Sequence, residues 1–217
     1  EVYLSGTQLI ITEDRDEKPL FEVTMLFAEV RLGQDQTSGK PLIAIAGAEP
    51  GSIWLVLVDG NANAGQRALA TMGEVGAIRS DFKKSFTMDQ KPLGAGSNAA
   101  VFKVNARCPG GEGAEDMVAK IGFDTPSAGG AIPKDVRQEV EMLTAVQRHP
   151  NIIGLHGLFR FAERVEGENN EQPVTRWVLT LQFCPNGDLF SAVSSAPFPE
   201  ARGREIVRGL LSALAHT

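Results

Sequence analysis

The sequence predicts an α+β protein built from two unlike segments. The first 78 residues hold short alternating or β-branched runs, separated by charged or glycine- and proline-containing turns, and end in one stretch of helical period. From residue 86 onward the order changes to strand, strand, helix, strand, strand, helix. With 217 residues, of which 42% are hydrophobic, the chain can bury either one large core or two small ones.

Composition and charge exclude several classes of protein. A formal net charge of −6 argues against a general attraction to nucleic acid, so no nucleic-acid partner is expected. No apolar run approaches the roughly 20 residues that cross a bilayer, and the first residues lack the features of a signal peptide. Cys108 and Cys184 fit neither a disulfide framework nor a zinc site, which indicates a reducing, cytoplasmic setting. The histidines show no metal-ligand spacing, so no metal site is expected.

Residues 1–78 are interpreted as a strand meander closed by a helix. The runs with strand character are VYLSGTQLIIT, PLFEVTML, AEVRL, PLIAIAG and SIWLVLVD. Helical spacing follows, because Leu69, Met72 and Val75 recur after a candidate N-cap at Asn61. Residues 79–85 lie in a polar stretch of little periodicity and are expected to be a linker.

This order of strands, acidic turn and capping helix resembles a pleckstrin-homology domain that lacks its first strand. In that family, basic residues on the first strands and their loop bind lipid headgroups. Here that region is missing or acidic, so the resemblance favours a regulatory or protein-binding β-rich module over one that binds membrane lipid.

A glycine-rich stretch opens the second segment. Its residues are Leu93, Gly94, Ala95, Gly96, Ser97, Asn98, Ala99, Ala100 and Val101. Small residues at a hairpin tip let backbone N–H groups approach an anion. Because strands flank the stretch and no helix follows, the sequence argues against a Rossmann or Walker phosphate loop, which must open a helix. Taken alone, the stretch fits a structural hairpin that needs glycine to turn better than it fits a phosphate site.

A lysine and a glutamate have the placement of an ion pair. Lys120 lies in the apolar strand run DMVAKIGF, where it either finds an anion or extends to solvent from a strand edge. A helix is expected from Pro133, with the inward stripe Val136, Val140, Leu143 and Val146. Glu139 lies beside that stripe and either pairs with Lys120 or is solvated on the helix flank. Glu141 lies about 200° further around the helix and is the less suitable partner.

An apolar strand that ends in a turn completes the set. The run RWVLTLQFCPNGDLFSAV places Leu181 near the strand end, then Gln182 and Cys184 before a Pro-Asn-Gly turn and a short helix. Such a crossover can present a backbone C=O and N–H to the edge of a purine. Asp188 either hydrogen-bonds a ribose hydroxyl or caps the short helix.

Taken in order and spacing, these motifs resemble one family. Residues 86–217 resemble the N-terminal lobe of a protein kinase followed by the first helices of its large lobe. The resemblance implies an antiparallel sheet with helix C, then helices D and E, with ATP as the nucleotide. The last of these helices carries a stripe expected to face a core, made of Ile206, Val207, Leu210, Leu211 and Leu214.

The resemblance also implies a role for each matching residue. Leu93, Val101 and Val118 would contact adenine, and Leu181 would form the back of the pocket. The loop of Gly94, Ala95, Gly96 and Ser97 would cover the phosphates, and Lys120, oriented by Glu139, would bind the α- and β-phosphates. The Gln182 C=O and Cys184 N–H would make the hinge contacts, and Asp188 would contact the ribose. The sequence departs from the family pattern at Ala99, where a third glycine is usual, at Asn98, often aromatic, and at Val118, usually alanine.

The implied activity is that of a protein serine/threonine kinase, which moves the ATP γ-phosphoryl group to a protein hydroxyl. The 217 residues contain neither the H-R-D-x-x-x-x-N nor the D-F-G motif. Mg²⁺ is therefore expected only through residues beyond them, and this fragment alone is expected not to transfer phosphate. Two alternatives are a pseudokinase scaffold and an adaptor whose N-terminal segment binds lipid or protein.

Overall fold

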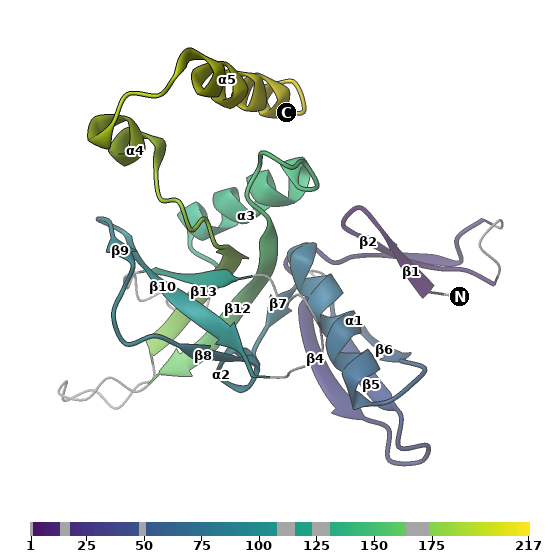
Figure 1. The fold of residues 1–217 in the computed structure, drawn as a ribbon. Coiled ribbons are helices and arrows are strands. Elements are labelled where there is room, and N and C mark those ends of the chain that lie inside the picture. Colours follow the sequence, from purple (N-terminus) through teal and green to yellow (C-terminus); the bar gives the residue numbers. More distant parts are fainter. Residues whose placement is uncertain (1, 14–17, 48–50, 108–115, 123–130, 164–173) are drawn as a thin grey trace.

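The computed structural model describes residues 2–13, 18–47, 51–107, 116–122, 131–163 and 174–217. Within these ranges the chain has the expected mixed α+β fold, with one large sheet and few helices (Figure 1). None of the described helices combines the length with the apolar character that a bilayer crossing requires.

The N-terminal half consists of short strands and one long helix. Its elements are β1 (Val2–Ser5), β2 (Gln8–Ile11), β3 (Phe21–Thr24), β4 (Glu29–Gln34), β5 (Pro41–Ala46), β6 (Ile53–Leu57) and α1 (Ala62–Glu74). The first expected strand is in fact a hairpin, because the chain turns at Gly6, whose φ of 57° favours glycine. The expected cap is present, since the Asn61 side chain accepts hydrogen bonds from the N–H groups of Asn63 and Ala64.

One face of α1 packs on the sheet and forms the first core. Leu69 of α1 is buried in one cluster with Ile43 and Ile45 of β5. At Gly65 the helix touches β5 so closely that a Cβ would lie 2.6 Å from the Pro41 side chain. This contact fixes the spacing between α1 and β5, because a packed core yields little to added volume.

The C-terminal half is mainly antiparallel sheet with helices at one end. Its elements are β7 (Ile78–Arg79), α2 (Phe82–Ser85), β8 (Phe86–Met88), β9 (Gly94–Ala95), β10 (Ala99–Ala106), β11 (Met117–Gly122), α3 (Lys134–Val146), β12 (Leu155–Glu163), β13 (Val174–Gln182), α4 (Leu189–Ser195) and α5 (Glu200–Leu214). The expected order of strand, strand, helix, strand, strand, helix is present in β10, β11, α3, β12, β13 and α4.

A very short strand joins the two halves into one sheet. Ile78 and Arg79 of β7 pair in parallel with β4 on one side and β12 on the other. Among the described residues, the resulting 10-stranded sheet runs β6-β5-β4-β7-β12-β13-β11-β10-β8, with β9 on β10, and β1-β2-β3 form a separate sheet. The structure does not show a separate pleckstrin-homology-like domain, because β4 to β6 belong to a sheet that continues into the C-terminal half.

The segment expected to be a linker is a packed junction. Arg79 is only 4% exposed and donates hydrogen bonds to both carboxylate oxygens of Asp81, at 3.0 and 2.8 Å. Phe82 is buried and stacks on Phe161, with 5.8 Å between the ring centroids. Sequence periodicity misses such a junction because Phe82 and Phe86 stand among polar residues and β7 is too short to alternate.

The two faces of the C-terminal sheet are buried by different groups. One face packs against α3, and here Val118 and Leu179 share a cluster with Val140. The opposite face is covered by the α2 region through an aromatic cluster made of Phe82, Phe86, Phe159 and Phe161. Side chains that alternate along β11 and β13 therefore serve two separate cores.

The helices α4 and α5 lie beyond α3, away from the sheet (Figure 1). The stripe on α5 that was expected to face a core is largely exposed, at 54% for Val207, 60% for Leu211 and 68% for Leu214. The helix is attached to the loop after α3 by a 3.0 Å hydrogen bond between His149 Nε2 and Ser212 Oγ. In this chain, the stripe therefore meets solvent.

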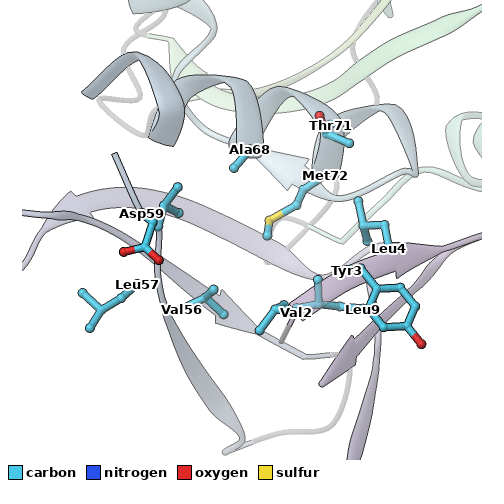
Figure 2. Close-up of a pocket in the computed structure, with 11 residues that line it drawn as sticks. Val2, Tyr3, Leu4, Leu9, Val56, Leu57, Asp59, Ala68, Thr71 and Met72 are labelled. Atoms are coloured by element: carbon cyan, nitrogen blue, oxygen red, sulfur yellow. The ribbon is translucent and has the colours of Figure 1, made fainter. Parts of the chain in front are cut away.

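A pocket of 530 Å³ lies between β1, β6 and α1 (Figure 2). Its walls are mainly apolar and include Val2, Leu4, Leu9, Val56 and Met72. The neighbouring β6 is the edge of the large sheet, and its Ile53, Leu55 and Leu57 side chains are exposed. An uncharged edge of this kind is open to pairing with another chain.

The Arg79–Asp81 pair makes stability depend on pH. Burial raises the pKa of Asp81, but the hydrogen bonds and charge of Arg79, with a bond from Ser85, outweigh it and leave the pKa below the ordinary 3.8. A carboxyl group whose pKa is lower in the folded than in the unfolded state stabilises the fold at pH values above its unfolded-state pKa. This stabilisation is lost as the pH falls through the folded-state pKa. We expect Asp81→Asn to lower stability at pH 7 and to flatten its decline below about pH 5. Urea unfolding across pH, with the exposed Asp89→Asn as control, measures this, and parallel curves for wild type and Asp81→Asn would contradict it.

The exposed stripe on α5 predicts self-association of the 217-residue chain. Leu211→Glu should reduce it, because it adds a charge to an apolar surface that favours contact between molecules. Ala201→Glu places the same charge on the same helix outside the stripe and should have little effect. Light scattering against concentration measures the difference, and a monodisperse wild-type chain would show that the stripe does not drive association.

Candidate functional site

Lys120 lies on the face of the sheet that packs against α3. It stands in β11 directly opposite Val101 of β10 and Leu179 of β13. Cross-strand neighbours share a face, so the lysine stem lies between two apolar side chains. Lys120 keeps 34% of its side-chain surface exposed, and it lies in an inner strand of the sheet. It is therefore not the edge-strand lysine of the alternative interpretation.

Glu139 is placed by the way α3 packs. The helix begins at Lys134 after Pro133, which is the N-cap residue rather than part of the first turn. Val136 and Val140 are buried and turn one side of α3 toward the core. Glu139 follows beside them and reaches the sheet, whereas Glu141 lies 3.8 Å from Arg137 on the exposed side.

The expected ion pair between the strand and the helix is present. The Lys120 Nζ lies 2.7 Å from each carboxylate oxygen of Glu139. Charge-assisted bonds to both oxygens fix the ammonium group in space, and the two side chains remain about one-third exposed. A positioned cation is thus held on the sheet between two apolar cross-strand neighbours, Val101 and Leu179.

The glycine-rich stretch forms a β-hairpin, as the sequence predicts. Gly94 and Ala95 pair with Val101 and Ala100, the Leu93 N–H donates to the Val101 C=O at 2.7 Å, and the turn closes through Gly96. Residues 93–98 are all exposed. Since Val101 of β10 is the cross-strand neighbour of Lys120 in β11, the hairpin adjoins the ion pair.

The fold does not require glycine at either position of this hairpin. Neither Gly94 nor Gly96 has a positive φ. A Cβ on Gly94 would meet nothing within 4 Å, and one on Gly96 only the Ala99 carbonyl oxygen at 3.9 Å. The interpretation that glycine is needed to make the turn therefore loses its basis. Open space above a glycine backbone suits the approach of another molecule.

The end of β13 forms a crossover that leads into a turn. The Gln182 N–H donates to the Gly154 C=O and the Phe183 N–H to the Asp116 C=O, which anchors this segment. Among the described residues, no hydrogen bond is found for the Cys184 N–H. Leu181 is buried and stands opposite Val118, on the same face as Lys120. An apolar wall with a backbone donor beside it is thus present.

Asp188 is the N-cap of α4. Its carboxylate accepts 2.7 Å hydrogen bonds from the Ser191 N–H and the Ser191 hydroxyl. These two bonds hold the pKa of Asp188 below its ordinary value. Both carboxylate oxygens accept hydrogen bonds within the first turn of α4, as the capping interpretation expects. Contact between Asp188 and a ribose stays a prediction.

The described residues hold no group of three or more histidine, cysteine, aspartate or glutamate side chains that would bind a metal ion. Beside the glycine hairpin, the polar groups are the Lys120 ammonium, the Glu139 carboxylate and backbone amides. This set can bind and orient an anionic, flat ligand, but it offers no base to a hydroxyl nucleophile.

Contacts that sequence reasoning did not anticipate reach α3 from the N-terminal half. The Arg137 guanidinium lies 4.5 Å from the centroid of the Phe27 ring, and the Gln147 side chain donates to the Glu74 C=O at 2.9 Å. Gly76 also lies against this helix. The only signal in the sequence is the glycine after α1, which is usual just beyond a helix end and says nothing about a distant partner.

Comparison with known proteins gives a distant similarity to protein kinases. No protein-family model matches the chain. Aurora kinase A-A from Xenopus laevis is 28% identical over 127 residues, which is 58% of this chain and 27% of that protein. A crystal structure of Rad53 1–466 in complex with AMP-PNP matches 95% of this chain and 48% of that chain, with 20% identity and a TM-score of 0.44. The chain spans little more than a quarter of its Aurora relative.

Glu139→Gln tests the ion pair by removing one charge while keeping the shape. Because both side chains are partly exposed, we expect the free energy of unfolding to fall by about 1 kcal/mol. Glu141→Gln is the matched control, because the Glu141–Arg137 ion pair has a longer N···O distance and is more exposed. Its effect on the free energy of unfolding should be about 0.3 kcal/mol. Urea unfolding measures both. Equal losses in the two variants would show that the Lys120–Glu139 contact has no special weight.

Proposed function

We propose that residues 86–217 are the ATP-binding part of a protein kinase that transfers the ATP γ-phosphoryl group to serine or threonine of a protein. The observation that carries the proposal is the Lys120–Glu139 ion pair, formed between an inner strand and a packed helix. A half-buried lysine that is held by a carboxylate has a fixed position, which phosphate binding requires.

The surroundings of the ion pair support a nucleotide as the ligand. Val101, Val118 and Leu181 share a sheet face with Lys120 and offer apolar contact to a flat base. The Cys184 N–H, without a partner among the described residues, is a donor for an acceptor on that base. The open backbone at Gly94 and Gly96 lets amide groups approach phosphate oxygens.

These residues bind and orient, whereas the chemical step needs groups that they do not include. Transfer to a hydroxyl requires a base near that hydroxyl and ligands for Mg²⁺, which neutralises charge on the phosphates. Neither the H-R-D-x-x-x-x-N nor the D-F-G motif is among the 217 residues. The proposed kinase is therefore a longer protein, and Mg²⁺ is bound through its other residues. The preference for serine or threonine rests on the family resemblance alone.

Lys120→Met tests the nucleotide site directly. At an ATP concentration 100 times the Kd, binding should stabilise the wild-type chain by about 2.7 kcal/mol, and Lys120→Met should lose most of that gain because the phosphates lose their cation. Differential scanning fluorimetry with and without ATP measures it. Lys103→Met is a matched control, since Lys103 is also a half-exposed strand lysine paired with a carboxylate, that of Asp116 at 3.2 Å.

Two outcomes would overturn the proposal. One is a wild-type chain that ATP does not stabilise, and the other is an equal shift in wild type and Lys120→Met. ATP binding with no phosphoryl transfer by the longer protein would instead leave the site intact and define a pseudokinase.

A further inference from the structure

We propose that the N-terminal half acts as a clamp on α3 and that Phe27, Gly76 and Gln147 are positioning residues for Glu139. The inference rests on the proposed function and adds a structural reason for the orientation of Glu139. None of the three residues lies beside Lys120 in the sheet register. Phe27 and Gly76 contact α3 and Gln147 is its C-cap residue, so they act on the site only through the orientation of that helix.

The contacted residues form one continuous stripe along α3 that ends at its C-cap residue, Gln147. Arg137, Val140, Thr144 and Gln147 are separated by three, four and three residues, so they share a helix face. Different parts of the N-terminal half meet this stripe along most of the helix length. We call these four residues the clamp stripe.

Phe27 meets the first residue of the clamp stripe. Its ring stacks on the Arg137 guanidinium, 4.5 Å from the ring centroid. Leu26 and Phe27 both pack against the cluster that contains Val136 and Val140. Phe27 has a φ of 63°, a conformation that bulky residues rarely adopt, and its N–H donates to the Gly76 C=O at 2.9 Å. A backbone held in this way points to a contact that the structure maintains.

Gly76 meets the middle of the clamp stripe. It has a φ of 88°, and a Cβ there would lie 2.6 Å from a Leu26 methyl carbon and 3.3 Å from side-chain carbons of both Val140 and Thr144. The turn between α1 and β7 is therefore at contact distance from α3. Gln147 completes the stripe by donating to the Glu74 C=O at the end of α1, at 2.9 Å.

Rotation of α3 links these contacts to the ion pair. Residues advance about 100° around a helix, so Glu139 lies about 120° from the centre of the clamp stripe. A helix held along that stripe cannot turn about its axis without breaking the contacts, and any such turn would carry Glu139 away from Lys120. The clamp is itself fixed to the sheet that holds Lys120, because β7 pairs with β12 and α1 packs on β12.

The coupling between Lys120 and Glu139 measures the clamp without any nucleotide. A double-mutant cycle of Lys120→Met and Glu139→Gln, read by urea unfolding, gives this coupling in the 217-residue chain. We expect the coupling to be lost in a Phe27→Ala background and reduced in a Gln147→Ala background. Phe21→Ala is the matched control, because Phe21 is an exposed aromatic of the same half whose ring meets Trp54 at 5.1 Å, and there the coupling should persist.

ATP affinity, measured by calorimetry, gives the functional readout. Phe27→Ala should weaken ATP binding about 5-fold, and this loss should vanish in a Glu139→Gln background because the clamp acts through Glu139. A merely structural role would produce the same loss in both backgrounds. If Phe27→Ala does not fold, Gln147→Ala, which removes only one surface hydrogen bond, carries the test.

The outcomes for the clamp and for ATP binding are separable. Unchanged Lys120–Glu139 coupling in both Phe27→Ala and Gln147→Ala would overturn the clamp, whatever ATP does. A wild-type chain that does not bind ATP would overturn the proposed function, while loss of the coupling in the clamp variants would still support the mechanical part of the inference.

Discussion

The architecture depends on the hydrogen bonds that β7 makes on both of its sides. Ile78 and Arg79 pair with β4 and with β12, which turns two groups of strands into one sheet. Through this pairing the N-terminal strands and the strand that holds Lys120 belong to one sheet, and the packing of α1 on β12 adds to the same junction. The buried Arg79–Asp81 pair secures the chain just after β7, because an arginine at 4% exposure needs its carboxylate partner.

The site itself was largely visible in the sequence, because its chemistry is tied to local patterns. Lys120 interrupts an apolar strand and Glu139 interrupts the inward side of a helix, and a half-buried charge needs an opposite charge nearby. The glycine hairpin was also visible, but its meaning was not. In the structure, neither the backbone conformation nor the packing demands glycine at Gly94 or Gly96.

What the sequence could not show are contacts between residues far apart in the chain. Nothing around Phe27 indicates that its ring meets Arg137, and nothing in the polar run after Ile78 indicates that Phe82 is buried. Such contacts depend on how whole elements pack, which local periodicity does not encode. The stripe on α5 shows the opposite problem. Its amphipathic pattern predicts that the helix packs on another surface, but in this chain the stripe is exposed.

The continuity of the sheet has a consequence for how this protein loses its structure. Because β7 lies inside the sheet, each of its amide hydrogens is directed at a neighbouring segment, as the Ile78 N–H is at the Ala28 C=O, and exchanges only when that side of the sheet opens. The N-terminal half and the strands around Lys120 should therefore melt together in a single heat-absorption peak rather than as two domains with their own transitions. We therefore expect the strands from β4 to β13 to behave as one cooperative unit, although the sequence indicates two segments.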